Sequence, residues 1–147
     1  MENPFIPIFT SDGSAVGFPT IHCYNDICAT YLGNLSDRKR GKALINEEVY
    51  TAVSDVLSRP GDTSQYTASF RFWARKMFKD SGDCLMHRGK PVATMEQIYS
   101  IIVRCHGQCR HAGRDATVRT ISKYYSWIPK ELVANFVKMC PTCDVKR

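Results

Sequence analysis

Apolar residues recur three and four positions apart along much of the chain, which is the spacing of one face of an α-helix. In the stretch "NEEVYTAVSDVLSRPGD" this spacing predicts a helix that Asn46 caps and that Pro60 and Gly61 end. The apolar face of this helix comprises Val49, Val53, Val56 and Leu57. Because the same spacing returns further along the chain, we expect a mainly α fold.

The next stretch, "SQYTASFRFWARKMFKD", predicts a second helix with Ser64 as its cap. Large side chains lie one turn apart along it, and they are Tyr66, Phe70, Trp73 and Met77. This stripe needs a covering partner, so we expect residues 46–103 to pack with the rest of the chain rather than form a detached domain. The weakly alternating stretch that follows predicts a small β-hairpin, with residues 84–87 paired with residues 91–93.

Three further helices are expected in the last third of the chain. "TMEQIYSIIVRC" begins with a capping pattern of Thr94 and Gln97, and Gly107 should end its helix. "RDATVRTISKYYSW", capped by Asp115, and "IPKELVANFVKMC", with Pro129 at its first position, predict two helices joined by a short turn. Helix, short turn and helix is the outline of a helix-turn-helix.

These patterns divide the 147 residues into three parts. Residues 1–35 are rich in Pro, Gly, Ser and Thr and predict an irregular arm, in which "IHCYNDICATYLGN" has the pattern of a short helix. Residues 36–97 form a helical and hairpin region that we expect to pack on the third part, residues 98–147. No run approaches about eighteen apolar residues, so no membrane partner is expected.

Cysteine content and charge indicate the kind of partner. The N-terminus has no secretory signal, so the seven cysteines suggest metal ligands or buried thiols before disulfides. Residues 1–103 carry eleven basic and eleven acidic residues, whereas residues 104–147 carry nine basic and three acidic ones. The net charge of +6 therefore lies in the last third, and a focused positive field favours a polyanion such as nucleic acid.

Histidine and cysteine pairs in this basic segment have the spacing of metal ligands. Four residues separate His106 from His111, two separate Cys140 from Cys143, and 28 lie between the pairs. Structural zinc takes four nitrogen or sulfur ligands in a tetrahedron, so the spacing predicts one structural Zn²⁺ at these four residues. Cys105 and Cys109 lie beside the histidines, and either is an alternative to one of them.

Several motifs surround these ligands: Ala112-Gly113 after the second histidine, Thr117, "YYSWIP" and "CPTC". With them, residues 98–145 resemble the HHCC zinc-binding domain of retrotransposon and retroviral integrases. The sequence of this segment is also similar to that of host proteins that have adopted this domain, among them fungal transcription regulators. The resemblance implies a zinc-stapled helix-turn-helix of the integrase N-terminal type, with nucleic-acid binding or protein assembly as its role.

We therefore expect sequence-specific binding of double-stranded DNA by a nuclear transcription regulator. The candidate contacts lie outside the apolar faces of the last two helices, and they are Arg114, Arg119, Lys123, Lys130, Asn135 and Lys138. The cations would mostly hold phosphates, while Asn135 would read a base edge. The alternative is a zinc-stapled module that dimerises or docks a chromatin protein.

We expect no enzymatic activity in these residues. Zinc with four protein ligands has no open position for water or for a small-molecule substrate. The chain ends four residues after Cys143, which leaves no room here for the nuclease domain that an integrase needs. The abrupt end suggests a piece of a longer protein.

Overall fold

A computed structural model of the chain describes residues 5–147, which form eight helices and three short strands. The elements in chain order are α1 (Ile21–Gly33), α2 (Asp37–Ala43), α3 (Glu47–Ser58), α4 (Ala68–Met77), β1 (Lys79–Asp80), β2 (Leu85–His87), β3 (Lys90–Pro91), α5 (Met95–Gln108), α6 (Arg114–Ser122), α7 (Lys130–Lys138) and α8 (Pro141–Lys146). The fold is mainly α with a small antiparallel sheet of order β1-β2-β3, as the sequence predicts. None of the described helices is both long and apolar enough to cross a membrane.

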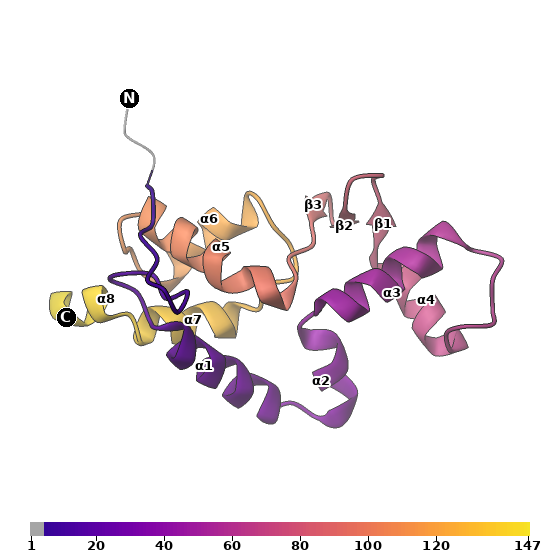
Figure 1. Cartoon of the computed structure of the whole chain (residues 1–147), viewed down its shortest axis with the longest axis horizontal. Coiled ribbons are helices and arrows are strands. Elements are labelled where there is room, and N and C mark those ends of the chain that lie inside the picture. Colours follow the sequence, from indigo (N-terminus) through magenta and orange to yellow (C-terminus); the bar gives the residue numbers. More distant parts are fainter. Residues whose placement is uncertain (1–4) are drawn as a thin grey trace.

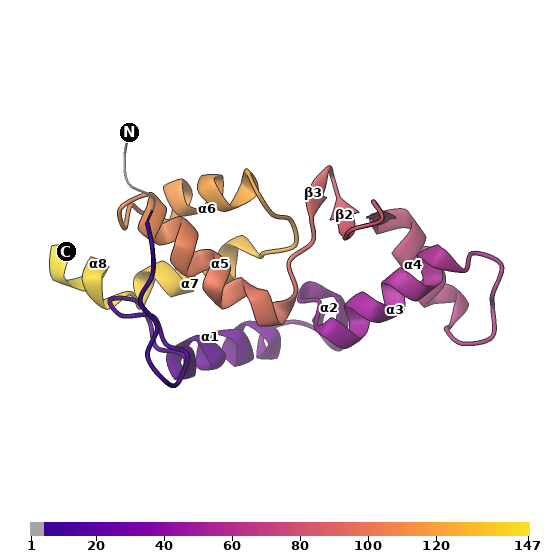
Figure 2. The same cartoon turned by 45° about the horizontal axis from the view of Figure 1, so that its top comes forward.

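The elements form two lobes, which lie at opposite ends of the molecule in both views (Figures 1 and 2). The first lobe consists of an arm, residues 5–20, together with α1 and α5–α8. The second lobe consists of α3, α4 and the sheet, and α2 lies between the two. Each lobe has its own hydrophobic core.

The first core is built around α5 and α7. Ile98, Ile102 and Phe136 are fully buried in it, since both helices turn an apolar face inward. Helix α1 packs along α7 and adds Tyr24 and Ile27. Segments from the two ends of the chain therefore share one core.

The arm is tied to this core by the hydroxyl of Tyr99. The Ala15 N–H donates to that hydroxyl at 2.8 Å, and the hydroxyl donates to the Pro19 carbonyl at 2.7 Å. Within the segment of residues 1–35, the stretch with the pattern of a short helix forms α1 (Ile21–Gly33), which packs on α7. The first four residues of that segment lie outside the described part of the chain.

The second core joins α3, α4 and the sheet. Val53 and Val56 of α3 are buried against Phe78 and Leu85. The predicted aromatic stripe of α4 is half-buried along this core, and it is Tyr66, Phe70, Trp73 and Met77. Most of the cover for the stripe thus comes from within the second lobe.

One side chain from the first lobe, Trp127 in the α6–α7 loop, completes the second core. Its ring lies 6.1 Å from the Trp73 ring and 4.9 Å from the rings of Phe78 and His87. Its indole N–H donates to the Lys42 carbonyl at 3.0 Å. Trp127 therefore joins the two lobes.

Replacing Trp127 with alanine should destabilise the second lobe by about 2 kcal/mol, because a half-buried aromatic ring loses its contacts. The measurement is urea denaturation of the zinc-loaded protein, followed by near-UV circular dichroism. Trp127→Phe should recover part of the loss, since it restores ring packing without the indole hydrogen bond. A free energy of unfolding unchanged in Trp127→Ala would contradict this role.

Helix starts depend on which side chain reaches the first free N–H groups. Asn46 caps α3 as predicted, since its side chain accepts from Val49 N–H at 2.8 Å. Helix α4 begins after Thr67 rather than Ser64, because the Ser64 hydroxyl donates to Asp62 at 2.6 Å. Helix α6 begins after Gly113 instead of Asp115, and Asp115 lies in its first turn.

Gly107 does not end α5, which continues to Gln108. A Cβ atom at Gly107 would lie 2.3 Å from the Phe5 ring, so the missing side chain makes room for the arm. The capping pattern at the other end of α5 is confirmed, with the Thr94 N–H donating to the Gln97 side chain at 3.0 Å. The predicted hairpin is present as β2 and β3, and β1 adds a third strand.

Candidate metal centre

Four side chains from three segments converge at one end of the first lobe. They are His106 of α5, His111 of the α5–α6 loop, Cys140 before α8 and Cys143 within α8. Their donor atoms all lie within 4.8 Å of one another. The separation by 28 residues along the sequence is thus closed by the packing of α5, α6 and α7.

The distances between donor atoms fit a tetrahedral zinc site. His106 Nε2 lies 3.2 Å from Cys143 Sγ, and His111 Nδ1 lies 3.4 Å from Cys140 Sγ and 3.9 Å from Cys143 Sγ. Bond lengths of about 2.3 Å to sulfur and 2.0–2.1 Å to nitrogen place such atoms about 3.6 Å apart in a tetrahedron. The observed distances lie on both sides of this value.

The loop after α5 bends sharply to bring His111 back over the helix end. Arg110 and His111 have positive φ angles of 57° and 56°, a left-handed backbone that non-glycine residues rarely adopt. The His111 N–H donates to the His106 carbonyl at 2.8 Å, which closes the bend. Strained backbone of this kind persists where surrounding contacts hold it, and metal ligation by His111 would be such a contact.

The two cysteines are placed by the start of α8. Cys140 is the N-cap residue, Pro141 follows within the first turn, and Cys143 lies on that turn. The spacing therefore turns both thiols to the same side, facing the two imidazoles. Cys140 and Cys143 are both buried.

A buried hydrogen-bond chain orients His106. Its Nδ1 lies 2.9 Å from the Thr117 hydroxyl, which in turn donates to the Gly113 carbonyl at 3.0 Å. With Nε2 facing the thiols, Nδ1–H donates to the hydroxyl, as is usual for histidines that bind metals. The motif residue Thr117 thus fixes the imidazole from behind.

Burial shapes the protonation of the ligands. It lowers the pKa of His106 to about 4, with the neighbouring His111 as a second cause. It raises the pKa of Cys143 to about 11, with Cys140 adding to the effect. The histidine is therefore neutral and ready to ligate, whereas the thiol must lose a proton, so metal binding releases protons.

The comparisons with known proteins bear on the same segment. Residues 94–147 match the family model of the integrase zinc binding domain. No curated protein and no solved structure matches the chain. The match includes all four ligands, so His106, His111, Cys140 and Cys143 are positioned to bind one zinc ion.

The two alternative ligands, Cys105 and Cys109, lie outside the set of four converging donor atoms. Cys105 is buried among apolar side chains, and burial raises the pKa of its thiol to about 11. Cys109 Sγ lies 3.5 Å from the His106 carbonyl oxygen and 3.6 Å from the Thr117 hydroxyl. Cys109 therefore lies behind His106, next to its supporting hydrogen bonds.

The arm covers the four converging side chains, a contact that the sequence pattern does not indicate. The Phe18 ring stacks on His111 with centroids 4.7 Å apart, and the Gly17 carbonyl accepts from the Thr142 hydroxyl at 2.6 Å. "GF" indicates a turn followed by an apolar side chain, but no sequence pattern connects residue 18 with residue 111. The covering residues could be found only from the structure.

The predicted DNA contacts lie on more than one surface. Five of the six candidates are exposed, namely Arg114, Arg119, Lys123, Lys130 and Lys138. Arg114 and Lys138 line one groove of about 530 Å³ between α6 and α7, whereas Lys130 lines another beside the α6–α7 loop. Asn135 is half-buried and is not among the side chains that line these grooves.

Proposed function

We propose that this chain binds double-stranded DNA in a sequence-specific manner, as part of a nuclear transcription regulator. The observation that carries the proposal is the exposure of the cations on α6 and α7, in the segment that holds the whole net charge. His111 precedes α6 and Cys140 follows α7, so a shared zinc ion would fix these two helices relative to each other. A rigid basic helix pair is suited to a duplex.

We further propose that the zinc is structural and that these residues catalyse no reaction. Four protein ligands fill a tetrahedral site and leave no position for water or substrate. Its role would be to convert metal affinity into folding energy.

The contacts on the two helices would differ in kind. Arg119 on α6 and Lys123 directly after its end are exposed and would hold phosphates. On α7, Lys130 and Lys138 are exposed while Asn135 is half-buried. Phosphate contacts would therefore supply most of the affinity, and base reading by Asn135 would be limited by its accessibility.

DNA binding weakens as salt rises, and the slope of log K against log salt concentration counts the phosphate contacts. The double variant Arg119→Glu, Lys123→Glu should lower the magnitude of this slope by about two, because two phosphate contacts are lost. The measurement is a competition titration with duplex DNA across salt concentrations, with zinc content checked in parallel. The matched control is Arg38→Glu, Lys39→Glu on α2, which changes the net charge equally at exposed positions. If the variant keeps both its zinc and its DNA affinity, the proposal that this basic surface contacts DNA is wrong.

A second function, assembly, is favoured by exposed apolar side chains at one end of the first lobe. In the arm, Ile6 and Ile8 are 76% and 70% exposed, and in α8 Val145 is 86% exposed. The arm and α8 are neighbours, since Thr142 contacts Gly17. Under this proposal the protein would dimerise or dock a chromatin protein, and analytical ultracentrifugation across protein concentrations separates a monomer from a dimer.

A further inference from the structure

The turn of the β2–β3 hairpin carries an arginine where its backbone disfavours one. His87 pairs with Lys90, and the two residues between them, Arg88 and Gly89, have φ angles of 51° and 77°. Turns of this type favour Asn-Gly or Asp-Gly, because both positions are left-handed. The Arg88 side chain is exposed, and its guanidinium has no hydrogen bond or ion pair with any described residue.

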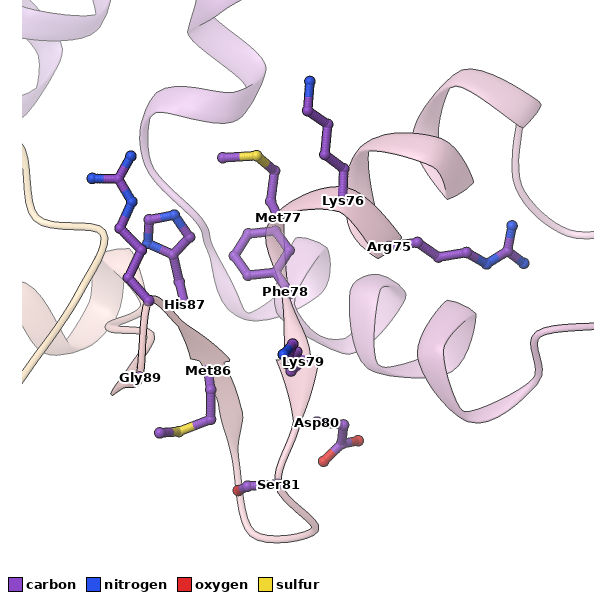
Figure 3. Close-up of a pocket in the computed structure, with 11 residues that line it drawn as sticks. Arg75, Lys76, Met77, Phe78, Lys79, Asp80, Ser81, Met86, His87 and Gly89 are labelled. Atoms are coloured by element: carbon purple, nitrogen blue, oxygen red, sulfur yellow. The ribbon is translucent and has the colours of Figure 1, made fainter.

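On one side of this turn lies a groove of about 700 Å³ between the hairpin and the end of α4 (Figure 3). Its apolar lining comprises Met77, Phe78 and Met86, and Figure 3 shows the Phe78 ring beside the His87 imidazole, 6.2 Å apart. Four cations also line it, namely Arg75, Lys76, Lys79 and Arg88, against one acidic residue, Asp80. The groove therefore combines apolar side chains with an excess of basic ones.

Not every cation of this groove is available to a ligand. Arg75 points away from the hairpin in Figure 3 and donates to the Pro60 carbonyl at 2.8 Å. The Asp80 carboxylate accepts from the Gly82 N–H at 2.8 Å. The Lys79 ammonium, in contrast, has no hydrogen bond or ion pair with any of residues 5–147.

A second groove, of about 350 Å³, lies on the other side of the turn, against the α6–α7 loop. Arg88 lines both grooves, and Lys90 and Lys130 line the second. The Lys90 ammonium donates to the Lys123 carbonyl at 2.9 Å, which places the hairpin next to the end of α6. Basic side chains of both lobes thus lie on either side of one exposed arginine.

We propose that the β2–β3 hairpin is a second contact surface for the phosphate backbone of a DNA duplex, with Arg88 as its central contact. This inference rests on the proposed function, since the same duplex would cross from α6 onto the hairpin. Cations distributed over both lobes match the regularly spaced charges of a duplex better than the short charged stretch of an acidic peptide. The net charge of residues 1–103 does not indicate this surface, because acidic residues elsewhere in that segment balance its cations.

The test is Arg88→Asn in the full chain, because asparagine adopts the left-handed turn readily and should preserve the hairpin. The probe is a mixed-sequence duplex of about 30 base pairs, roughly 100 Å long at 3.4 Å per step, which can reach both lobes. The salt slope should fall by about one unit in Arg88→Asn and by about two in Arg88→Asn, Lys79→Gln. The control Arg38→Gln on exposed α2 should leave the slope unchanged.

The outcomes separate this inference from the proposed function. An unchanged slope in Arg88→Asn, with a lowered slope in Arg119→Glu, Lys123→Glu, overturns the hairpin surface and leaves the α6 surface in place. The reverse result supports the hairpin and overturns the α6 surface. A wild-type chain that binds no duplex overturns both, and binding of polyglutamate through Arg88 in that case would identify an acidic protein as the partner.

Discussion

Replacing Cys143 with serine should remove the zinc and unfold most of the first lobe, not only the end of the chain. Its thiol is buried, lies 3.2 Å from His106 Nε2 and is one of four converging donors, so the variant loses a quarter of the ligand set. Zinc contributes about 10–16 kcal/mol to the folding of zinc-finger peptides, which is comparable to the total stability of a whole domain, about 5–15 kcal/mol. Elemental analysis and far-UV circular dichroism should show the loss of metal and of helix together.

The matched control for this loss is Cys109→Ser. The Cys109 thiol lies behind His106, 3.5 Å from its carbonyl oxygen and 3.6 Å from the Thr117 hydroxyl, and is not among the four converging donors. This variant should therefore keep one zinc per chain and nearly all of its helix. If Cys109→Ser released the zinc while His106→Ala retained it, the set of four ligands would be wrong.

Truncating Phe136 to alanine should destabilise the zinc-loaded protein by about 3–5 kcal/mol, the usual effect of deleting a large core aromatic side chain. Phe136 is fully buried, and its ring lies 6.1 Å from Tyr99, 6.3 Å from His106 and 6.5 Å from Phe18. One ring therefore supports α5, the arm and a metal ligand at once.

Urea denaturation at saturating zinc measures the effect of Phe136→Ala. Tyr124→Ala is the control, since Tyr124 is an exposed aromatic residue whose loss should change the free energy of unfolding by less than about 0.5 kcal/mol. Equal stability of the two variants would mean that the first lobe does not depend on this ring.

Local patterns predicted the parts of the molecule that local contacts decide. The apolar face of α7 and the cap of α3 follow from neighbouring residues, and both are present as expected. The spacing of His106, His111, Cys140 and Cys143 along the sequence predicts a common metal ion, and their donor atoms do converge in the structure. The predicted start of α4 was wrong because two polar residues near it can cap a helix. Thr67 caps α4, whereas the Ser64 hydroxyl donates to Asp62.

Contacts between distant segments could not be predicted in this way. Nothing in the sequence of the arm indicates that Phe18 stacks on His111 or that Phe5 fills the space above Gly107. The division into two cores was also hidden, because the aromatic stripe of α4 shows that cover is needed but not which segment supplies it. Trp127 belongs by sequence to the zinc-binding segment and by packing to the other lobe.

The sharing of the first core by both ends of the chain has a consequence for the order of folding. Helix α1 ends at Gly33 and its partner α7 begins at Lys130. At synthesis rates of about 5–20 residues per second, α1 emerges roughly 5–20 s before the helix that buries it. Closing the loop of residues 34–129 to bring α1 against α7 then costs roughly 4 kcal/mol of conformational entropy. Throughout that interval the apolar face of α1 is a nascent surface without its native cover, accessible to the chaperones that attend translation.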